Sequence, residues 1–334
     1  MTIIDVRWGC TMMTTKRLLA ALAGVAAIAG PGIGGAAATP ARCERSCLYD
    51  VLDRYLDALR ARDAGKVPWA PTARVTENNV ALKPGDGLWA TVTGLGRYQL
   101  RFADPVTGAI GFHGVVEESG ARSPFAVRLS VKNGRITEAE TVVVRMQDAG
   151  TPFTSPDLVD KPVLNEIVPP EHRSTRARMI TLADGYFETL QRNDGTLHTE
   201  FDPACSRREN GFQTTSNPEG AAKYGFIMGL SCAEQFKLGY FRFDDRLRGR
   251  RVVAVDEERG LVMMSAFIDH SGRLGEYRLT DGRTEMANIH RPHSFYLLET
   301  FKIRDGRIQQ VEANFTTVPY RMPSPWGAAG FRYE

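Results

Sequence analysis

The sequence predicts an α+β protein built from two tandem copies of one unit. Three observations support this: matching segments recur in constant order, each copy opens on an amphipathic helix pattern, and each copy closes on two strands joined by a tight turn. The matches join 55–59 with 186–190, 104–120 with 256–272, and 134–140 with 306–312. A solenoid needs three or more short repeats, so a two-copy match favours tandem duplication.

The helices are predicted from apolar residues that recur every three or four positions. In the first copy these positions are 48, 51, 52, 55, 56 and 59, and in the second they are 179, 182, 183, 186 and 190. Each set forms one apolar stripe along a helix. We therefore expect each copy to begin with a helix that packs on a sheet.

The rest of each copy is predicted to be mainly strand. The expected strands are 110–118, 125–131 and 136–145 in the first copy, and 240–243, 262–269, 295–303 and 308–317 in the second. Asn133-Gly134 and Asp305-Gly306 separate the last two runs of each copy, and such dipeptides are a strong signal for a hairpin.

The offset between matching segments increases along the chain, which predicts two insertions in the second copy, within 212–255 and 273–294. We expect repeats at 42–147 and 173–324. Residues 148–172 contain five prolines and are predicted to be a linker that is at most partly ordered.

The first 38 residues resemble an export signal. Lys16 and Arg17 precede an apolar run at 18–30, and small residues at 36–38 offer a cleavage site. The run is shorter than the roughly 20 residues that a membrane span needs, and a buried core helix is the alternative. The sequence therefore predicts a periplasmic or secreted protein with no membrane span after the signal is removed.

Composition excludes several classes of protein. Of 334 residues, 43% are hydrophobic and 24% are charged, and the formal net charge is +3. These values are ordinary for a folded domain and argue against disorder, collagen and a polytopic membrane protein. Because no long Lys/Arg run is present, we expect no nucleic-acid partner.

Four cysteines follow the predicted signal: Cys43, Cys47, Cys205 and Cys232. An even number in an exported chain favours disulfides. We expect a bond between Cys205 and Cys232, whereas Cys43 and Cys47 are only four apart and pair only with local distortion. A zinc site is the rival interpretation, but no matching His or Cys cluster accompanies them, so we expect no metal.

The leading helix, the Glu-Asn dipeptides at 77–78 and 209–210, and the closing Gly-Arg-Ile-x-x-x-Glu patterns at 134–140 and 306–312 resemble the SnoaL-like branch of the NTF2-like superfamily. The resemblance covers 42–145 and 175–320. It implies two conical barrels, each a helix packed in a curved antiparallel sheet, with an apolar pocket at the open end. Members include ketosteroid isomerases, polyketide cyclases, scytalone dehydratases and lyases of lignin-derived aromatics, and they generally need no cofactor. Other members only bind ligands or partners.

Motifs of other enzyme classes are missing from the sequence. It contains no G-x-S-x-G, no H-E-x-x-H, no Walker loop and no G-x-G-x-x-G after a strand. One hypothesis is therefore an exported, cofactor-independent lyase, isomerase or dehydratase that acts on a hydrophobic, aromatic small molecule, such as a lignin-derived or polyketide-like compound. The alternative is a non-catalytic module that binds a small molecule or another protein.

The closing hairpin of the second copy predicts a catalytic carboxyl pair. If residues 305–306 form a two-residue loop, Glu299 lies opposite Glu312, and Leu297 lies opposite Asn314. Two facing carboxyls in an apolar row cannot both be charged at low cost, so the pKa of one should be high, as a general acid or base requires. An outward-facing strand or a bulge that shifts the register by one residue is the alternative.

Further candidates lie near this hairpin. His293 precedes the same strand with the parity of Glu299 and is predicted to act at the pocket mouth. Glu209 either acts in the site or has a structural role at a strand end, and Tyr240 either lines the pocket or belongs to the core. His270 is expected in a turn. The predicted site thus comprises catalytic Glu299, Glu312 and His293, and substrate-binding Asn314, Glu209, Tyr240 and Leu297.

The two copies are also expected to pack on each other as an intrachain pseudo-dimer, sheet face against sheet face. The predicted contact residues are 110, 112 and 116 in the first copy and 262, 264 and 268 in the second. Burying both apolar faces is favourable by about 25 cal/mol per Å². A homo-oligomer is compatible with this arrangement.

Overall fold

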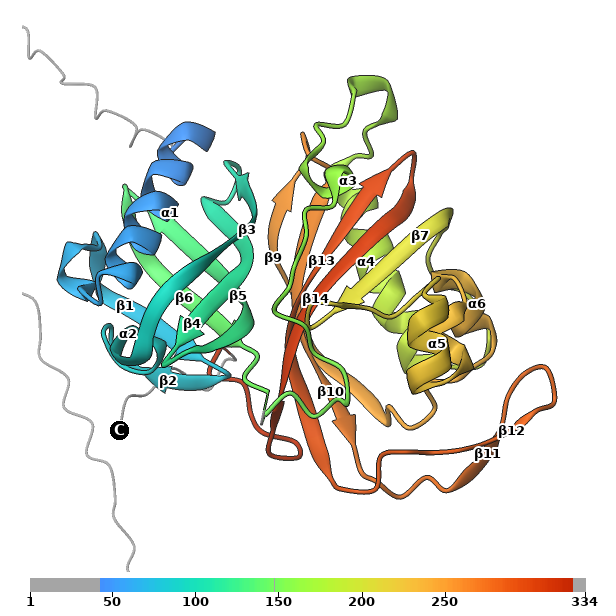
Figure 1. Cartoon of the computed structure of the whole chain (residues 1–334). Helices are drawn as coiled ribbons and strands as arrows, with labels where there is room; N and C mark the ends of the chain where they lie inside the picture. Colours follow the sequence, from blue (N-terminus) through green and yellow to red (C-terminus); the bar gives the residue numbers. More distant parts are fainter. Residues whose placement is uncertain (1–42, 147, 327–334) are drawn as a thin grey trace, which may run out of the picture. The chain divides into compact units, whose positions relative to one another are not determined.

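The computed structural model describes residues 43–146 and 148–326, so the predicted signal peptide lies outside the described residues. Each half contains one long helix and one six-stranded sheet (Figure 1). In the first half the elements are α1 (Arg45–Arg60), β1 (Trp69–Glu77), β2 (Val80–Leu82), α2 (Leu88–Thr91), β3 (Val92–Asp104), β4 (Ala109–Glu118), β5 (Ala121–Lys132) and β6 (Arg135–Val143). A short helix α3 (Pro162–Asn165) follows. In the second half they are α4 (Arg176–Arg192), β7 (Phe201–Glu209), β8 (Phe212–Gln213), α5 (Pro218–Tyr224), α6 (Cys232–Lys237), β9 (Arg246–Asp256), β10 (Leu261–His270), β11 (Glu276–Arg278), β12 (Thr284–Met286), β13 (His293–Arg304) and β14 (Arg307–Val318).

The two sheets have the same strand order. The first runs β2-β1-β6-β5-β4-β3 and the second runs β8-β7-β14-β13-β10-β9. In each sheet one pair is parallel, β1 with β6 and β7 with β14, and the other pairs are antiparallel. The sheets are therefore mixed, and the expectation of a purely antiparallel sheet is wrong for one pair in each half. The common order is consistent with two tandem domains of one fold, and the conical shape stays a prediction.

Both predicted helices are present, and their apolar stripes are buried. In α1 the side chains of Leu48, Leu52 and Leu59 are fully buried against the first sheet. Helix α4 begins where the Thr175 hydroxyl accepts a hydrogen bond from the backbone N–H of Arg178, at 3.2 Å. It ends at Asn193, whose φ of 48° is left-handed and stops the helix. Helical periodicity thus located both elements correctly.

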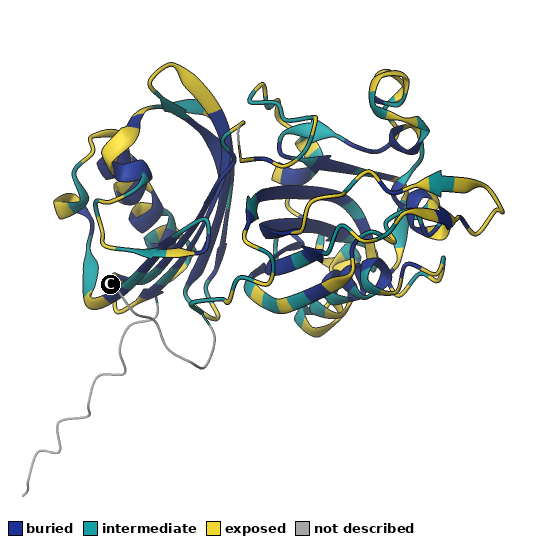
Figure 2. Ribbon diagram, turned by 90° about the horizontal axis from the view of Figure 1, so that it is seen from below, coloured by how far each residue is buried: buried dark blue, intermediate teal, exposed yellow. Residues whose placement is uncertain are grey.

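A third apolar cluster contains residues of both sheets. Its members include Tyr98, Leu100 and Phe102 of β3 and Met263, Phe267, Tyr296 and Leu298 of β10 and β13. The predicted contact residues are different: 110, 112 and 116 lie in the core of the first half, and 262, 264 and 268 lie in or against the core of the second. The predicted face was wrong because the central strands are buried on both sides (Figure 2), so alternation alone could not identify the outer face.

The two predicted insertions contain most of the irregular structure of the second half. Residues 212–255 include α5, α6 and a turn at 240–243, where a strand had been expected. The turn follows Gly239, whose φ of 60° redirects the chain. Residues 273–294 include the β11–β12 hairpin.

The proline-rich segment at 148–172 packs closely on the second half. The N–H of Ser155 donates to the carbonyl of Asn210 at 3.0 Å, and the N–H of Thr317 donates to the carbonyl of Asp148 at 2.8 Å. The Phe153 ring lies 5.5 Å from the ring of Phe212. This segment is therefore more ordered than the sequence predicts.

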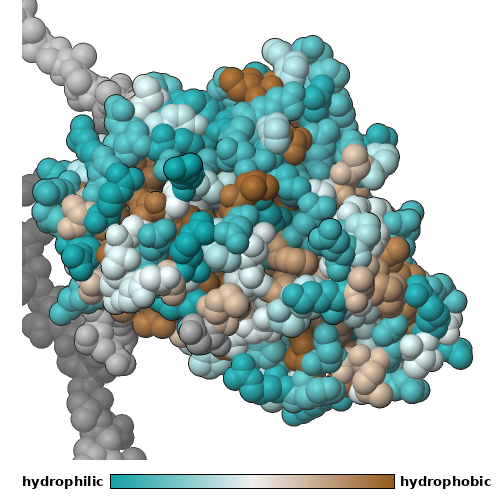
Figure 3. All heavy atoms as spheres, in the orientation of Figure 1, coloured by the Kyte–Doolittle hydropathy of each residue, from teal (hydrophilic) through white to brown (hydrophobic). Residues whose placement is uncertain are grey.

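Two disulfides are present, Cys205–Cys232 as predicted and Cys43–Cys47 at the start of α1. They are compatible with export to an oxidising compartment. Within 43–146 and 148–326, no helix is long and apolar enough to cross a membrane. On the face shown in Figure 3, hydrophobic residues occur in scattered patches among hydrophilic ones.

Candidate functional site

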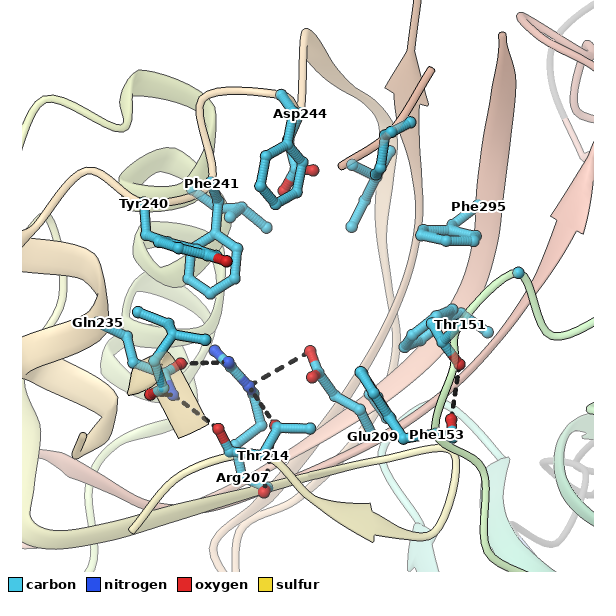
Figure 4. A pocket seen from close by; sticks show the side chains of 18 of the residues that line it. Thr151, Phe153, Arg207, Glu209, Thr214, Gln235, Tyr240, Phe241, Asp244 and Phe295 are labelled. Carbon is cyan, nitrogen blue, oxygen red and sulfur yellow. Dashed lines mark hydrogen bonds and ion pairs between the residues drawn. The ribbon is translucent and has the colours of Figure 1, made fainter. Parts of the chain in front are cut away.

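The second half contains a cavity of about 250 Å³ between its sheet, α4 and the inserted segments (Figure 4). Ligand pockets usually measure about 300–1,000 Å³, so this cavity suits a small molecule. Its walls are largely aromatic, formed by Phe153, Tyr224, Tyr240, Phe241, Phe243, Phe295 and Phe315. Its polar lining is formed mainly by Arg207, Glu209, Gln235, Asp244, His270 and Glu299.

Two carboxyl groups face the cavity from one row of the sheet. Ala313 of β14 pairs with Glu209 of β7 on one side and with Glu299 of β13 on the other. Neighbouring strands lie about 4.8 Å apart, so the two glutamate backbones are roughly 10 Å apart. Because Ala313 has only a methyl group, it leaves space between the two acids. The sheet therefore presents two carboxyls to one small ligand.

The environments of the two acids differ. Glu299 is 4% exposed, and burial, followed by the charge of Glu209, raises its pKa to about 8. The charge of Arg207 and a hydrogen bond from Tyr186 oppose this rise. Glu209 instead lies 3.3 Å from the guanidinium of Arg207, which favours its charged form. At neutral pH Glu299 is therefore mainly a carboxylic acid, whereas Glu209 forms an ion pair with Arg207.

Arg207 is 3% exposed, and several hydrogen bonds hold its buried guanidinium group in place. Its Nε donates to the hydroxyl of Thr214 at 3.1 Å, and its Nη1 donates to the hydroxyl of Tyr186 at 3.3 Å. Its Nη2 donates to Gln235, whose own amide donates to the carbonyl of Ile227 at 2.7 Å. Helix α6, which belongs to the first insertion, therefore positions Arg207, and Arg207 in turn positions Glu209.

The predicted pairing of Glu299 with Glu312 is wrong because the hairpin contains a bulge. Arg304 pairs with Arg307 as expected, but the register shifts by one residue between Lys302 and Ile303. Glu299 therefore lies opposite Ala313. The remaining pairs shift with it: Thr300 with Glu312, Leu298 with Asn314 and Leu297 with Phe315.

The same shift moves Glu312 and Asn314 to the other face of the sheet. Glu312 lies 2.6 Å from Arg208, which also donates to the hydroxyl of Tyr98 at 2.7 Å. Asn314 contacts Nδ1 of His113 at 2.6 Å. Neither residue lines the cavity. Both belong instead to buried polar contacts with the first half.

The other predicted residues lie at or near the cavity. Glu209, Tyr240 and Leu297 line it together with Glu299. His293 does not line it but stacks on His270, with ring centroids 4.7 Å apart. His270 was expected in a turn; it is instead the last residue of β10, it is 1% exposed and it lines the cavity.

Asp244 and His270 form a second polar group in the lining. Nε2 of His270 lies 2.8 Å from Oδ1 of Asp244, and both side chains are buried. This pair was not predicted from the sequence, because Asp244 lies in an inserted turn and 26 residues separate the two. The cavity residues Thr151 and Phe153 were missed for a related reason, since they belong to the expected linker.

The first half lacks the carboxyl pair. Its corresponding row is Glu77, Thr141 and Val127, so a valine occupies the position of Glu299. Glu77 is already bound, because it lies 2.9 Å from Arg145 and accepts from the N–H of Leu88 at 2.6 Å. The second half alone therefore presents two acids in one such row.

The repeated asparagines of the Glu-Asn dipeptides have a structural role. Asn78 and Asn210 both have left-handed φ angles, of 48° and 49°. The side-chain oxygen of Asn78 accepts from the N–H of Val143 at 2.8 Å, and that of Asn210 accepts from the N–H of Phe315 at 2.9 Å. Each asparagine therefore ends one strand and joins it to its neighbour.

A family model described as Domain of unknown function (DUF8021) matches residues 172–315. A comparison with curated proteins finds no significant match.

Solved structures similar to this chain include an NTF-2 like protein of unknown function and two enzymes. An NTF-2 like protein of unknown function from Burkholderia xenovorans is 12% identical, covers 35% of this chain and 95% of its own, and has a TM-score of 0.26. A steroid delta-isomerase from Pseudomonas aeruginosa is 14% identical, covers 30% and 82%, and has a TM-score of 0.25. An LEH-like epoxide hydrolase from M. tuberculosis is 16% identical, covers 30% and 84%, and has a TM-score of 0.23.

Proposed function

We propose that the second half is a cofactor-independent acid–base enzyme, of isomerase, lyase or dehydratase type, that acts on a small aromatic molecule. The observation that carries this proposal is the pair Glu209 and Glu299 in one row of an aromatic-walled cavity, where Glu209 is paired with Arg207 and burial raises the pKa of Glu299 to about 8. Two titratable groups in such contrasting environments are typical of acid–base sites.

The two acids have different roles in the proposed mechanism. Glu209, as a carboxylate, removes a proton from a substrate carbon next to a carbonyl group. Glu299, as a carboxylic acid, donates a hydrogen bond to the carbonyl oxygen as negative charge develops there. Returning the proton to another carbon gives isomerisation, whereas expulsion of a neighbouring hydroxyl or ether oxygen gives dehydration or lyase chemistry. Arg207 keeps Glu209 charged and fixed in direction.

The cavity limits the substrate to a compact, apolar compound. Its aromatic walls favour a flat ring through offset or edge-to-face contacts. Lignin-derived and polyketide-like aromatics meet this description, and the proposal includes them as substrate classes. We further propose that the chain is exported by its first 38 residues, and that the first half arose by duplication and supports the second.

The proposal is tested by proton exchange on a simple probe. We expect the purified protein to accelerate deuterium uptake at the acidic C–H positions of 2-tetralone, a two-ring aromatic ketone, in D₂O at pH 7. Mass spectrometry measures the uptake, and buffer alone gives the background rate. If 2-tetralone binds but exchanges only at the background rate, the chain is instead the non-catalytic binding module considered above.

A further inference from the structure

The cavity contains a second polar group that the proposed mechanism does not use. Asp244 and His270 line it, and His270 is stacked between aromatic neighbours. Its ring lies 4.7 Å from the ring of His293 and 4.8 Å from that of Phe295. The residue is therefore held rigidly, which is expected of a group that positions a ligand.

One nitrogen of His270 is free to accept a hydrogen bond. Nε2 lies 2.8 Å from Oδ1 of Asp244. Burial raises the pKa of Asp244, and the hydrogen bond with His270 opposes this rise. We assign the imidazole proton to Nε2, the arrangement in which His270 donates to an ionised Asp244. Nδ1 then has a free lone pair. This atom is buried and has no hydrogen-bond partner among the described residues. An unsatisfied buried acceptor is unfavourable, and a ligand with a suitable donor would remove that cost.

His270 and Glu299 lie at different ends of the site. His270 pairs across the sheet with His293, which is six residues from Glu299 on the same strand. Six residues span about 20 Å of strand backbone. Because the side chains of His270 and Glu299 both line one cavity of about 250 Å³, a ligand that lies between them is shorter than this backbone separation. Figure 4 likewise shows Asp244 across the cavity from Glu209 and Arg207. A ligand that reaches both ends meets aromatic walls in the middle, an acid at one end and a free acceptor at the other.

We propose that His270, positioned by Asp244, binds a hydroxyl group on the aromatic ring of the substrate. The substrate class is therefore a phenol whose remote end carries the oxygen function that Glu299 contacts. A phenol fits better than an aromatic amine because its more acidic O–H forms the stronger hydrogen bond with imidazole. This inference rests on the proposed function, since it assumes that the cavity binds an aromatic substrate.

The test compares two probes that differ only in the donor, 4-propylphenol and its methyl ether, by calorimetric titration. A net hydrogen bond contributes about 0.5–1.5 kcal/mol, so we expect the wild-type protein to bind the phenol about three- to tenfold more tightly. In His270→Phe the preference should fall to about one. The matched control, His172→Phe, changes an exposed histidine bound to Asp305 and should keep the preference.

A second measurement needs no variant. In ¹⁵N NMR, the signal of the unprotonated imidazole nitrogen of His270 should move on addition of 4-propylphenol and remain in place with the ether. Equal affinity of the two probes for the wild-type protein, or a preference that survives in His270→Phe, overturns the inference but leaves the carboxyl pair untouched. If neither probe binds, the aromatic ligand class fails for both proposals.

Discussion

Glu209→Gln is expected to slow deuterium exchange on 2-tetralone at least about a hundredfold at pH 7, the usual scale of a lost general base. The amide has the same shape but cannot take up the substrate proton. Arg207 keeps its bonds to Thr214, Tyr186 and Gln235, so the fold should survive. The rate is measured by mass spectrometry and folding by circular dichroism.

The repeat offers a matched control for this variant. Glu77→Gln makes the same change at the corresponding position of the first half, where the carboxyl group is bound to Arg145 and the Leu88 N–H. It should lower stability and leave the exchange rate within about twofold, because no second acid accompanies it. Glu209→Gln with full activity and a lower melting temperature would show that Glu209 is structural and would remove it from the mechanism.

Glu299 contributes a distinct pH dependence to the same reaction. Burial and the charge of Glu209 raise its pKa to about 8, so the carboxyl group is protonated at pH 7 and loses its proton as the pH rises through about 8. If the protonated form is required, the exchange rate falls above pH 8. In Glu299→Leu, which removes the donor, the rate should fall about 100- to 1,000-fold. The fall of the exchange rate above pH 8 should then be absent from this variant.

Glu140→Gln is expected to lower the free energy of unfolding by about 3–5 kcal/mol, the cost of breaking a buried ion pair. The side chain of Glu140 is fully buried and lies 2.8 Å from Arg128 of its own half. It also contacts Arg251 and Tyr296 of the second half. The neutral amide removes the fully buried counter-charge of Arg128, which is itself 4% exposed, and leaves it only the partly buried Glu138. Urea unfolding followed by fluorescence measures the loss.

A surface pair provides the control for Glu140. Glu188 is partly exposed and lies 2.7 Å from Arg192, one helical turn away on α4, and 3.4 Å from Arg250 of β9. Glu188→Gln should change the free energy of unfolding by less than about 1 kcal/mol, because water and salt screen exposed pairs. Equal effects of the two substitutions would mean that the buried contacts between the halves contribute little to stability.

The sequence was informative wherever local patterns determine the structure. The apolar stripes of α1 and α4 and the tight turns at Asn133-Gly134 and Asp305-Gly306 are short-range signals, and the structure contains all four. The asparagine at 78 and 210 recurs in both copies, and the structure gives it the same role in each. These features depend on neighbouring residues and not on the tertiary arrangement.

The site was only partly accessible from the sequence. The turn at 305–306 predicted the correct first pair, but the bulge at the register shift between Lys302 and Ile303 changed which residues face the cavity. A strand such as β13 is buried along almost its whole length, so alternation could not reveal the error. Glu299 was identified correctly as a carboxyl group in an apolar row. The second acid of that row, Glu209, comes from β7, which lies beyond β14 in the sheet and is far from β13 in sequence.

Asp244 and His270 illustrate a further limit. They meet only because the inserted turn returns to the end of β10. No spacing rule connects an aspartate in such a turn with a histidine that ends a strand. Comparison of the two copies identified features that both share, but an inserted segment has no counterpart in the first copy. Residues that belong to one copy alone therefore had to come from the structure.

The most direct test of the acid–base site is a ¹³C NMR titration of glutamate carboxyl carbons in the free protein, with Glu299→Leu used to assign the signal of Glu299. The account predicts that this signal titrates with a pKa of about 8, because burial and the neighbouring Glu209 oppose its ionisation. A Glu299 signal that titrates near the ordinary value of about 4.3 would contradict the proposed mechanism, because Glu299 would then be ionised at neutral pH and could not donate a hydrogen bond to the substrate.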